Sequence, residues 1–277
     1  MDNSKWRYYR HAVLPTTAPH ENVDLTEIKS GAVWKMKGLP FFARWTENFD
    51  CEQTTNWWYC IKDEPFEFEQ VKSKRRTEIR KGLKNCRVDV INPLSAIEDI
   101  YSILQTCYEE YPSQYRPECS LEITKKMCKK WEKSHVLFVA YDHDGELVGF
   151  TAVEPKEDYV NFEILKVPAK YQKMEVTAAL VYTMVNYFLR EGSPYKYICD
   201  GERNLIHQTN FMEYLVDKFA FRYAYCDLKM AYRPIVWVIV TILYPFRKIL
   251  KKFKNIPLIY NVLAVLKMEE IVRGNKI

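Results

Sequence analysis

The chain has 277 residues, which is enough for a sizeable core and for one large domain or two small ones. Hydrophobic residues make up 48% and charged residues 28%, which excludes a disordered chain, and the net charge of +5 permits an anionic partner without demanding one. The 8 cysteines form no Cys-x-x-Cys pair and have no matching histidine spacing, so we expect no metal site. The first residues hold no apolar core typical of a signal peptide, so we expect reduced cysteines and a cytoplasmic protein.

Residues 1–92 are predicted to form a β-rich N-terminal part that ends in a basic helix. Proline, glycine and asparagine separate segments rich in β-formers, which predict strands over 8–14, 32–36, 41–45 and 57–61. A helix over 68–85 and a strand over 86–91 are expected to follow. Because Asn92-Pro93 is a natural break, we place a domain boundary after residue 92.

Residues 93–233 are predicted to form the second domain. Two helices are expected over 95–110 and 121–133, joined by a loop that is too rich in proline to be helical. Short apolar runs predict strands over 136–141, 147–153 and 159–165, and the turn at 142–145 joins the first two, because Asp-Gly tolerates the positive φ of a hairpin. The domain is expected to end with a helix over 177–189, a strand over 195–199, a helix over 210–219 and a strand over 223–232.

Residues 234–277 are predicted to form an apolar and basic helical tail. The apolar run at 234–246 is shorter than the roughly 20 residues that a bilayer span needs, so we do not expect it to cross a membrane. In the segment 246–254, five cations lie opposite an apolar helical face formed by Phe246, Ile249, Leu250 and Phe253. A last helix is expected over 258–273, with Pro257 in its first turn and an apolar face of Ile259, Val262, Leu263 and Leu266.

The tail has two interpretations. An apolar face opposite a row of cations is typical of a helix that lies in the headgroup region of an anionic membrane. The same helices would also suit a hairpin packed on the domain or a dimer contact. We favour binding of residues 234–273 to an anionic membrane surface, which would place the protein on the inner face of the membrane.

The order of elements over about 86–232 resembles that of the GNAT acyltransferase fold. The segment Arg76–Gly82 also resembles the Arg-x-x-Ile-Arg-x-Ala/Gly segment of the Fem-type aminoacyltransferases, and residues 200–204, 209–211 and 219–226 are similar to that group. The resemblance implies an α+β fold, a GNAT-like mixed sheet flanked by helices, with the β-rich N-terminal part and the helical tail added to it.

The resemblance also implies an activity. Fem-type enzymes build peptidoglycan cross-bridges from aminoacyl-tRNA and a lipid-linked precursor, and related GNAT-like proteins occur in bacterial surface-polysaccharide loci. We therefore expect an acyltransferase of cell-envelope biogenesis that moves an acyl or aminoacyl group from acyl-CoA or aminoacyl-tRNA to an amine of a sugar or peptide precursor. The expected partners are that precursor and tRNA, not DNA. The alternative is a GNAT-fold membrane-associated scaffold or ligand-binding protein without catalysis.

The loop before the helix at 177–189 aligns with the Gln/Arg-x-x-Gly-x-Gly/Ala loop of GNAT enzymes. Backbone N–H groups and a helix N-terminus hold the pyrophosphate of coenzyme A there, and glycine lets the anion approach closely. Gln172 fits the motif, and with Lys173 it is a candidate phosphate ligand. Glu175 and Thr177 replace the small residues, so a carboxylate would repel the phosphate and argue against acyl-CoA, unless Glu175 simply favours the first helical turn.

Acyl transfer to an amine needs a base for the amine proton, donors for the oxyanion and an acid for the leaving group. The resemblance places the reaction where the fourth and fifth strands of the GNAT fold diverge, and Glu163 on the fourth strand is the candidate base. Alternation puts Glu163 on one face with Asn161 and Leu165, and Phe162 and Ile164 on the other. The alternatives for Glu163 are a buried salt bridge or a solvent-facing position.

Polar residues close the fifth strand, where a site is well placed. Asp200 is a candidate catalytic carboxylate, and Arg203 and Asn210 are candidates for binding a phosphate or substrate. The resemblance implies that Tyr214 protonates the leaving group, and His207 could carry a proton. The alternative is an ordinary turn followed by a helix N-cap.

The basic helix carries a stripe in which Lys72, Arg76 and Arg80 recur every four residues. Its functional interpretation is phosphate binding by Arg76 and Arg80, whether of a lipid diphosphate, tRNA or coenzyme A. The alternative is a solvated helix face. The aromatic residues 57–59 with Trp45 are more typical of core packing than of a sugar or lipid platform.

Overall fold

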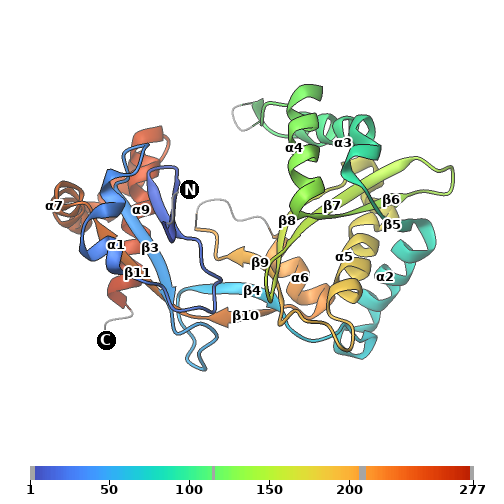
Figure 1. Ribbon diagram of the computed structural model, residues 1–277, viewed down its shortest axis with the longest axis horizontal. Coiled ribbons are helices and arrows are strands. Elements are labelled where there is room, and N and C mark those ends of the chain that lie inside the picture. Colours follow the sequence, from blue (N-terminus) through green and yellow to red (C-terminus); the bar gives the residue numbers. More distant parts are fainter. Residues whose placement is uncertain (1–3, 114–115, 206–209, 275–277) are drawn as a thin grey trace. The chain divides into compact units, whose positions relative to one another are not determined.

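A computed structural model describes residues 4–113, 116–205 and 210–274 (Figure 1). Contacts divide the chain into two compact units. Unit 1 comprises Met1–Tyr59, Glu202–Thr209 and Tyr223–Ile277, and unit 2 comprises Cys60–Gly201 and Asn210–Arg222. These boundaries differ from the divisions expected after residues 92 and 233, because pairing between distant strands, rather than chain order, decides which segments pack together.

A mixed sheet of order β10-β4-β9-β8-β7-β6-β5 runs through unit 2, and the unit boundary falls within β4, β9 and β10. Its strands are β4 Trp58–Lys62, β5 Arg87–Ile91, β6 Val136–Tyr141, β7 Leu147–Pro155, β8 Val160–Lys166, β9 Ile198–Glu202 and β10 Arg222–Tyr225. Strands β5 to β8 are antiparallel neighbours, and β8 and β9 are parallel. The strands predicted over 57–61, 86–91, 136–141, 147–153 and 159–165 are therefore confirmed, with small shifts at their ends, whereas the strand predicted over 195–199 runs from Ile198 to Glu202.

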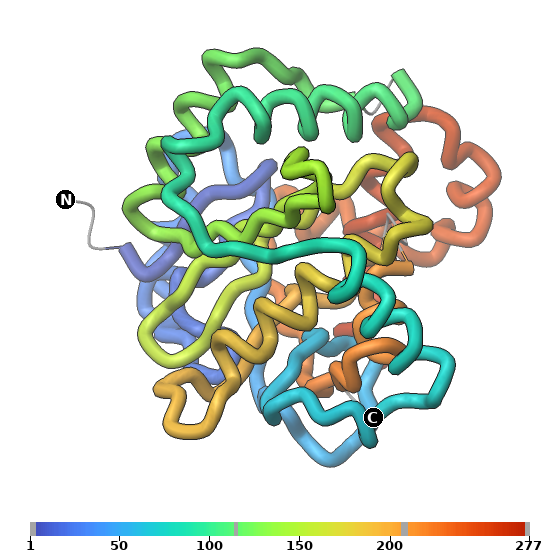
Figure 2. Tube along the Cα trace, turned by 90° about the vertical axis from the view of Figure 1, so that its right-hand side faces the viewer, coloured from blue at the N-terminus to red at the C-terminus, as the bar shows by residue number. Residues whose placement is uncertain are grey.

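Helices cover both sides of this sheet. They are α2 Ser73–Asn85, α3 Ile97–Glu109, α4 Leu121–Ser134, α5 Val176–Phe188 and α6 Phe211–Phe219, with short 3-10 turns η2 Phe68–Gln70, η3 Pro93–Ala96 and η5 Ala169–Met174. In both views, α3 and α4 lie on one side of strands β5 to β8, and α2 and α5 lie on the other (Figures 1 and 2). Unit 2 thus has three layers.

Local sequence explains these elements. Helix α3 buries Ile100, Ile103, Leu104 and Cys107, the i, i+3, i+4, i+7 spacing of one helical face. Helix α4 begins where the Ser120 hydroxyl accepts a hydrogen bond from the Ile123 N–H. In the predicted hairpin, the Asp142 carboxylate accepts hydrogen bonds from two backbone N–H groups, and Gly145 has a φ of +83°.

Gly82 sets how closely α2 approaches α5. A Cβ atom added to Gly82 would lie 2.4 Å from the carbonyl oxygen of Glu175 and 3.1 Å from the nitrogen of Ala179. Contacts this short are not possible without moving one helix away from the other. The glycine of the Fem-like segment therefore has a packing role here.

Unit 1 contains a four-stranded sheet of order β1-β2-β3-β11. Its elements are β1 Trp6–Tyr9, β2 Ala12–Pro15, α1 Thr26–Lys29, η1 Ala32–Lys35, β3 Phe42–Glu47, β11 Asp227–Tyr232, α7 Pro234–Leu243, η6 Tyr244–Phe246, α8 Arg247–Leu250, η7 Lys251–Phe253 and α9 Pro257–Gly274. Helix α9 contacts β11, and its residues Met268 and Ile271 join a core that includes Trp57 and Leu228. The predicted last helix is confirmed.

Several predicted elements are wrong. The single strand expected over 8–14 is a hairpin, because Arg10 and His11 both have positive φ and turn the chain back on itself. The strand expected over 32–36 is the 3-10 turn η1, which follows Gly31 in a left-handed conformation. Neither position carries the Asn-Gly or Asp-Gly pair that marks a turn in sequence.

Two longer elements are divided in the structure. The strand expected over 223–232 is two strands, because the chain changes sheets at Cys226: β10 belongs to the seven-stranded sheet and β11 pairs with β3. The helix expected over 246–254 is the short helix α8 followed by the 3-10 turn η7.

Candidate functional site

Strands β8 and β9 separate soon after they begin. Their parallel pairing covers only Val160 with Ile198 and Asn161 with Cys199. Beyond those positions β8 continues to Lys166 and β9 continues to Glu202 without pairing to each other. The divergence expected between the fourth and fifth strands of the GNAT fold is confirmed, and both Glu163 and Asp200 lie just beyond the last paired residues.

A β-bulge changes the direction of Glu163. Ala152 of β7 pairs with Ile164 and Val153 pairs with Phe162, so Glu163 is the extra residue. Ile164 packs against the core cluster beneath α3 and α4. Glu163 lies on the same side of the sheet, because it contacts His135, whose ring lies next to Trp131 of α4. The expected strict alternation along this strand is therefore wrong, because the bulge interrupts the two-residue period.

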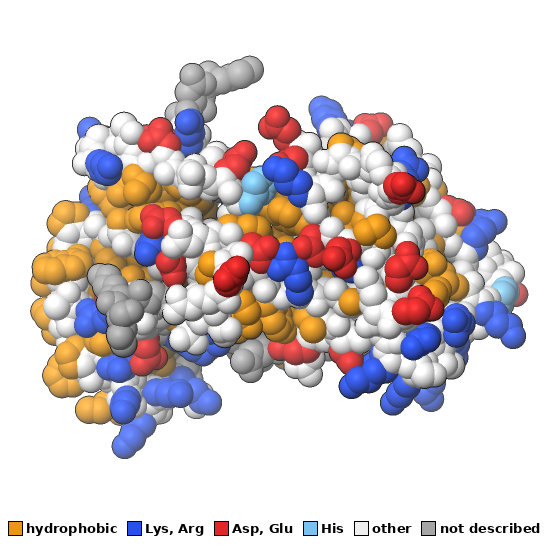
Figure 3. All heavy atoms as spheres, turned by 90° about the horizontal axis from the view of Figure 1, so that it is seen from below, with side chains coloured by type: hydrophobic (Ala, Val, Ile, Leu, Met, Phe, Trp, Pro, Cys, Tyr) orange, Lys and Arg blue, Asp and Glu red, His pale blue; other side chains and the backbone are white. Residues whose placement is uncertain are grey.

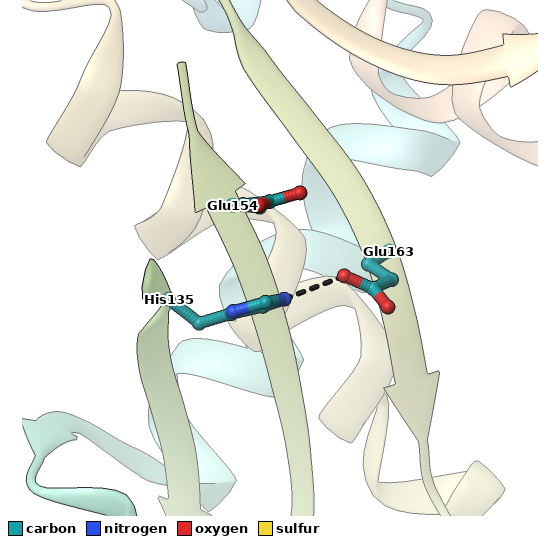
Figure 4. A group of neighbouring side chains, drawn as sticks. All are labelled: His135, Glu154 and Glu163. Carbon is teal, nitrogen blue, oxygen red and sulfur yellow. Dashed lines mark hydrogen bonds and ion pairs between the residues drawn. The ribbon is translucent and has the colours of Figure 1, made fainter. Parts of the chain in front are cut away.

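Glu163 forms a close pair with His135, the residue that precedes β6 (Figure 4). His135 Nε2 lies 2.5 Å from Glu163 Oε2, and the hydrogen bond from His135 holds the pKa of Glu163 below its usual value. The Ser134 hydroxyl donates to the carbonyl of Lys130 at 3.2 Å and lies 2.8 Å from His135 Nδ1. Ser134 and Glu163 therefore hold the two nitrogens of the imidazole ring.

The same corner of unit 2 brings three possible metal ligands together. Ligand atoms of His135, Glu154 and Glu163 all lie within 4.8 Å of one another. However, Lys156 Nζ lies 2.7 Å from the Glu154 carboxylate, and Lys130 Nζ lies 4.0 Å from that of Glu163. Each of the two carboxylates thus has a lysine close to it, besides the hydrogen bond that Glu163 receives from His135.

Asp200 has a different environment from Glu163. It follows the last β9 residue that pairs with β8, and its carboxyl group has no hydrogen-bond partner among the described residues. Burial raises its pKa to about 7, because the charged form loses hydration without gaining a partner. A carboxyl group that titrates near neutral pH is suited to accept and release a proton.

Tyr214 lies on α6 with a buried hydroxyl group that has no hydrogen-bond partner among the described residues. Burial raises its pKa above the usual value, so the hydroxyl stays protonated and remains a potential donor. The Tyr214 ring stacks on Phe211 with ring centres 5.8 Å apart, and Phe211 in turn meets Phe162 of β8 at 5.7 Å. The aromatic contacts therefore connect Tyr214 to the strand that carries Glu163.

A network of charged side chains joins α2, α6 and the start of α5 beside Tyr214. Lys218 is 5% exposed, and its Nζ lies 2.9 Å from Glu175, 3.1 Å from Glu78 and 4.6 Å from the centre of the Tyr214 ring. Arg75 pairs with Glu78 and with Asp217. Burial pushes the pKa of Glu78 up, but hydrogen bonds from Arg75 and Lys218 hold it below its usual value.

The loop expected to hold coenzyme A has the backbone shape that a glycine would supply. Glu175 has a φ of +60° and ends the 3-10 turn η5 immediately before α5, while Gln172 and Lys173 are exposed on that turn. The Glu175 carboxylate is paired with Lys218, which removes part of the repulsion that its charge would exert on a phosphate. Thr177 is partly exposed in the first turn of α5. The loop can therefore approach an anion, although its side chains are larger than those of the motif.

The predicted stripe of basic residues on α2 is only partly available to a ligand. Arg76 Nε donates to the carbonyl of Val71 at 2.9 Å, and the guanidinium of Arg80 lies 4.8 Å from the centre of the Phe68 ring. Arg80 is exposed and Arg76 is half-buried. Both remain on α2 in unit 2, with Arg80 the more accessible to a ligand.

The remaining predicted ligands differ in their surroundings. Arg203 belongs to unit 1, where its guanidinium donates to the carbonyl of Asn56 at 2.5 Å and covers the Trp58 ring at 4.2 Å, and burial lowers its pKa. Asn210 is exposed at the start of α6, and its side chain makes no cap hydrogen bond. His207 lies outside the described residues.

A cavity of about 300 Å³ lies elsewhere in unit 2. It is lined by the start of β6, the end of β7 and the segment after α5, including Val136, Pro155 and Arg190. The predicted site residues do not line it.

Two contributors to the site were missed in sequence. His135 stands at the end of a helix with no motif around it, and only the bulge brings Glu163 to its ring. Lys218 resembles any cation in the last turn of a helix, and its burial depends on three elements packing together. No local signal identifies either residue.

Comparisons with known proteins give structural likeness only. No protein-family model matches the chain, and no curated protein matches it either. Among solved structures, FemX aligns with a TM-score of 0.54 and 8% identity over 78% of each chain. L-PGS from Bacillus licheniformis aligns with a TM-score of 0.51 and 13% identity, over 86% of this chain and 84% of that one. The C-terminal domain of a putative lysylphosphatidylglycerol synthetase from Agrobacterium fabrum aligns with a TM-score of 0.50, 13% identity and the same coverage. The chain therefore has an α+β, GNAT-like fold similar to that of FemX and L-PGS, as its sequence predicted.

Proposed function

We propose that the chain is an acyltransferase that moves an acyl or aminoacyl group from an activated donor to an amine of a cell-envelope sugar or peptide precursor. The observation that carries the proposal is the divergence of β8 and β9 beside Asp200, a carboxyl group whose pKa is raised to about 7. A base with such a pKa is half ionised near neutral pH and can take a proton from an attacking amine. The likeness to FemX supports the same class of reaction, at the level of fold.

In the proposed reaction, the amine nitrogen attacks the carbonyl carbon of the donor and a C–N bond forms. Asp200 accepts the proton that the nitrogen loses. The C–S bond of a thioester or the C–O bond of an aminoacyl ester then breaks, and Tyr214 protonates the leaving sulfur or oxygen. The raised pKa of Tyr214 keeps its proton available until negative charge develops on the leaving group.

Glu163 receives a positioning role in this proposal. The hydrogen bond from His135 already engages its carboxylate and lowers its pKa, so it is a weaker base than Asp200 near pH 7. The His135–Glu163 pair lies at the bulge of β8, beside the point where β8 and β9 stop pairing. Glu163→Gln should therefore reduce turnover less than Asp200→Asn does.

The proposal is compatible with two acyl donors, acyl-CoA and aminoacyl-tRNA. The αL conformation of Glu175 and the start of α5 suit a pyrophosphate, which favours acyl-CoA. The exposed Arg80 suits a phosphate backbone, which favours aminoacyl-tRNA. The name lysylphosphatidylglycerol synthetase among the structural neighbours describes an aminoacyl product, which gives the second donor additional support.

The test supplies both donors to the full chain. Acetyl-CoA or an aminoacyl-tRNA is incubated with an amino sugar and with a peptide that has a free amine, and release of the thiol or loss of the aminoacyl ester is followed. We expect the wild-type chain to consume one donor about 100-fold faster than Asp200→Asn, since general base catalysis contributes at least that much. Tyr214→Phe should be slowed as well.

The control is an unchanged fold, checked by circular dichroism of each variant. If neither donor is consumed faster by the wild-type chain than by a folded Asp200→Asn variant, the transferase proposal is wrong. The alternative, a GNAT-fold scaffold or ligand-binding protein without catalysis, would then hold.

A further inference from the structure

The C-terminal segment of unit 1 exposes an unusual amount of apolar surface. Of the eighteen large apolar side chains that are exposed in the described residues, ten lie between residues 235 and 258. They are Ile235, Trp237, Val238, Ile239, Ile242, Phe246, Ile249, Phe253, Ile256 and Leu258. Exposed apolar side chains scattered singly need no explanation, but a contiguous set of this size marks an interaction surface.

Helix α7 is the most apolar part of this surface. Every residue of α7 except Thr241 is apolar, yet only Val240 is buried. Trp237 and Ile242 are 58% and 59% exposed. In Figure 3, hydrophobic side chains gather over the end of the molecule where Figure 1 places α7, with lysine and arginine side chains next to them. A helix that buries one of its nine apolar residues cannot owe its composition to packing within unit 1.

Positive charge accompanies the apolar residues. The sequence from Pro234 to Met268 contains six lysines and arginines and no aspartate or glutamate. Arg247 pairs with Glu270 of α9, at 3.1 Å. The other cations of α8 and the turn after it are exposed and have no ion pair within the described residues: Lys248, Lys251, Lys252 and Lys254. Their charge is therefore available to an anionic partner.

Helix α9 holds this surface in place. Its residues Leu266, Met268 and Ile271 are buried, and Glu269 accepts a hydrogen bond from the Tyr232 hydroxyl at 2.8 Å. The guanidinium of Arg273 covers the Tyr244 ring at 3.8 Å. The sequence left open whether the tail packs on the domain or binds a membrane. Helix α9 packs on β11, whereas residues 235–258, apart from Val240, stay outside the core.

We propose that residues 235–258 form a docking surface for an anionic lipid bilayer, into which the apolar side chains insert while Lys248, Lys251, Lys252 and Lys254 contact lipid phosphates. Among the described helices, none is long and apolar enough to cross a bilayer, so the surface lies in the headgroup region. Large exposed apolar side chains next to unpaired lysines match the layers of such a membrane, with its apolar interior and its anionic surface. The surface would bring unit 1 to lipid-linked molecules.

The test is flotation of the full chain with lipid vesicles. We expect the wild-type chain to float with vesicles that contain phosphatidylglycerol, to float weakly with pure phosphatidylcholine, and to bind less in high salt, because salt screens the lysines. Each lysine near an anionic surface contributes about fivefold to partitioning. A variant with all four lysines changed to glutamine should therefore bind at least about 100-fold more weakly.

Two further variants make the test specific. Phe246→Ser, Ile249→Ser and Phe253→Ser together should abolish binding to both kinds of vesicle, because the inserting side chains are lost. As a matched charge control, glutamine replaces Lys125, Lys126, Lys129 and Lys133, four of the exposed lysines of α4 in unit 2, and binding should remain at the wild-type level. Circular dichroism confirms that each variant is folded.

Three results would overturn the proposal. The first is a wild-type chain that stays with the soluble fraction whatever the lipid. The second is equal loss of binding in the tail and control variants, which would indicate a non-specific charge effect. The third is a stable dimer by light scattering that the serine variant disrupts while flotation is unchanged, since a second copy of the chain would then cover the surface.

Discussion

At the scale of single residues, Asp200 and Glu163 show how the environment gives two carboxylates different pKa values. The sequence indicated both as catalytic candidates. Glu163 accepts a hydrogen bond from His135, which stabilises its charge and lowers its pKa. Asp200 is half-buried and has no hydrogen-bond partner among the described residues, which destabilises its charge and raises its pKa to about 7. The same side-chain chemistry therefore gives a carboxylate with a lowered pKa in one place and a carboxyl group with a raised pKa in the other.

The raised pKa of Asp200 makes the stability of the chain depend on pH. Between about pH 4 and pH 7 the folded chain keeps a proton at Asp200 that the unfolded chain has lost, so the free energy of unfolding falls as pH rises through this range and then levels off. Asp200→Asn removes this loss. From pH 5 to pH 8, we expect the free energy of unfolding of the variant to rise by roughly 1 to 3 kcal/mol relative to that of the wild type, measured by urea denaturation at both pH values.

Asp144→Asn serves as the matched control, because Asp144 is exposed in the hairpin turn. Its free energy of unfolding should follow the wild type at both pH values. Equal pH dependence in the wild type and in Asp200→Asn would show that Asp200 titrates as an ordinary aspartate.

At the scale of elements, the contact between α2 and α5 depends on the absence of a side chain at Gly82. In an exposed helix, replacing glycine by alanine stabilises by about 1 kcal/mol. At Gly82 the added methyl group would lie 2.4 Å from the Glu175 carbonyl oxygen, so α2 would have to move and the network of Lys218 with it. We expect Gly82→Ala to lower the free energy of unfolding by about 1 to 3 kcal/mol in chemical denaturation.

Gly274 provides the comparison for this change. It ends helix α9, and an added Cβ atom there would meet no heavy atom within 4 Å. Gly274→Ala should change the free energy of unfolding by less than about 0.5 kcal/mol. If Gly82→Ala were as stable as the wild type, the close approach of α2 and α5 would be wrong.

At the scale of the whole molecule, the sequence was informative where structure follows local pattern. The strands and helices from 86 to 219 follow apolar periodicity and turn chemistry, so their order could be predicted, and with it the fold. Pairings between distant segments could not. Strand β4 enters the sheet between β9 and β10, and β11 leaves the sheet of β10 to pair with β3, although no local signal marks either event.

The candidate site follows the same rule. The sequence order placed Asp200 directly after a strand, whereas β9 extends to Glu202 and contains it; Tyr214 lies on the next helix, as expected. The bulge that aims Glu163 at His135 and the burial of Lys218 beside Glu175 arise only when three or more elements pack together. Sequence therefore named candidate residues of the site, and the structure distinguishes their surroundings.

The pH dependence of transfer tests the central claim most directly. With the donor that the wild-type chain consumes, the rate should rise along a limb with an apparent pKa near 7, as Asp200 loses its proton. Asp200→Asn should lose this limb and about 100-fold in rate, whereas Glu163→Gln should keep the limb. A full limb and an undiminished rate in Asp200→Asn would contradict the account.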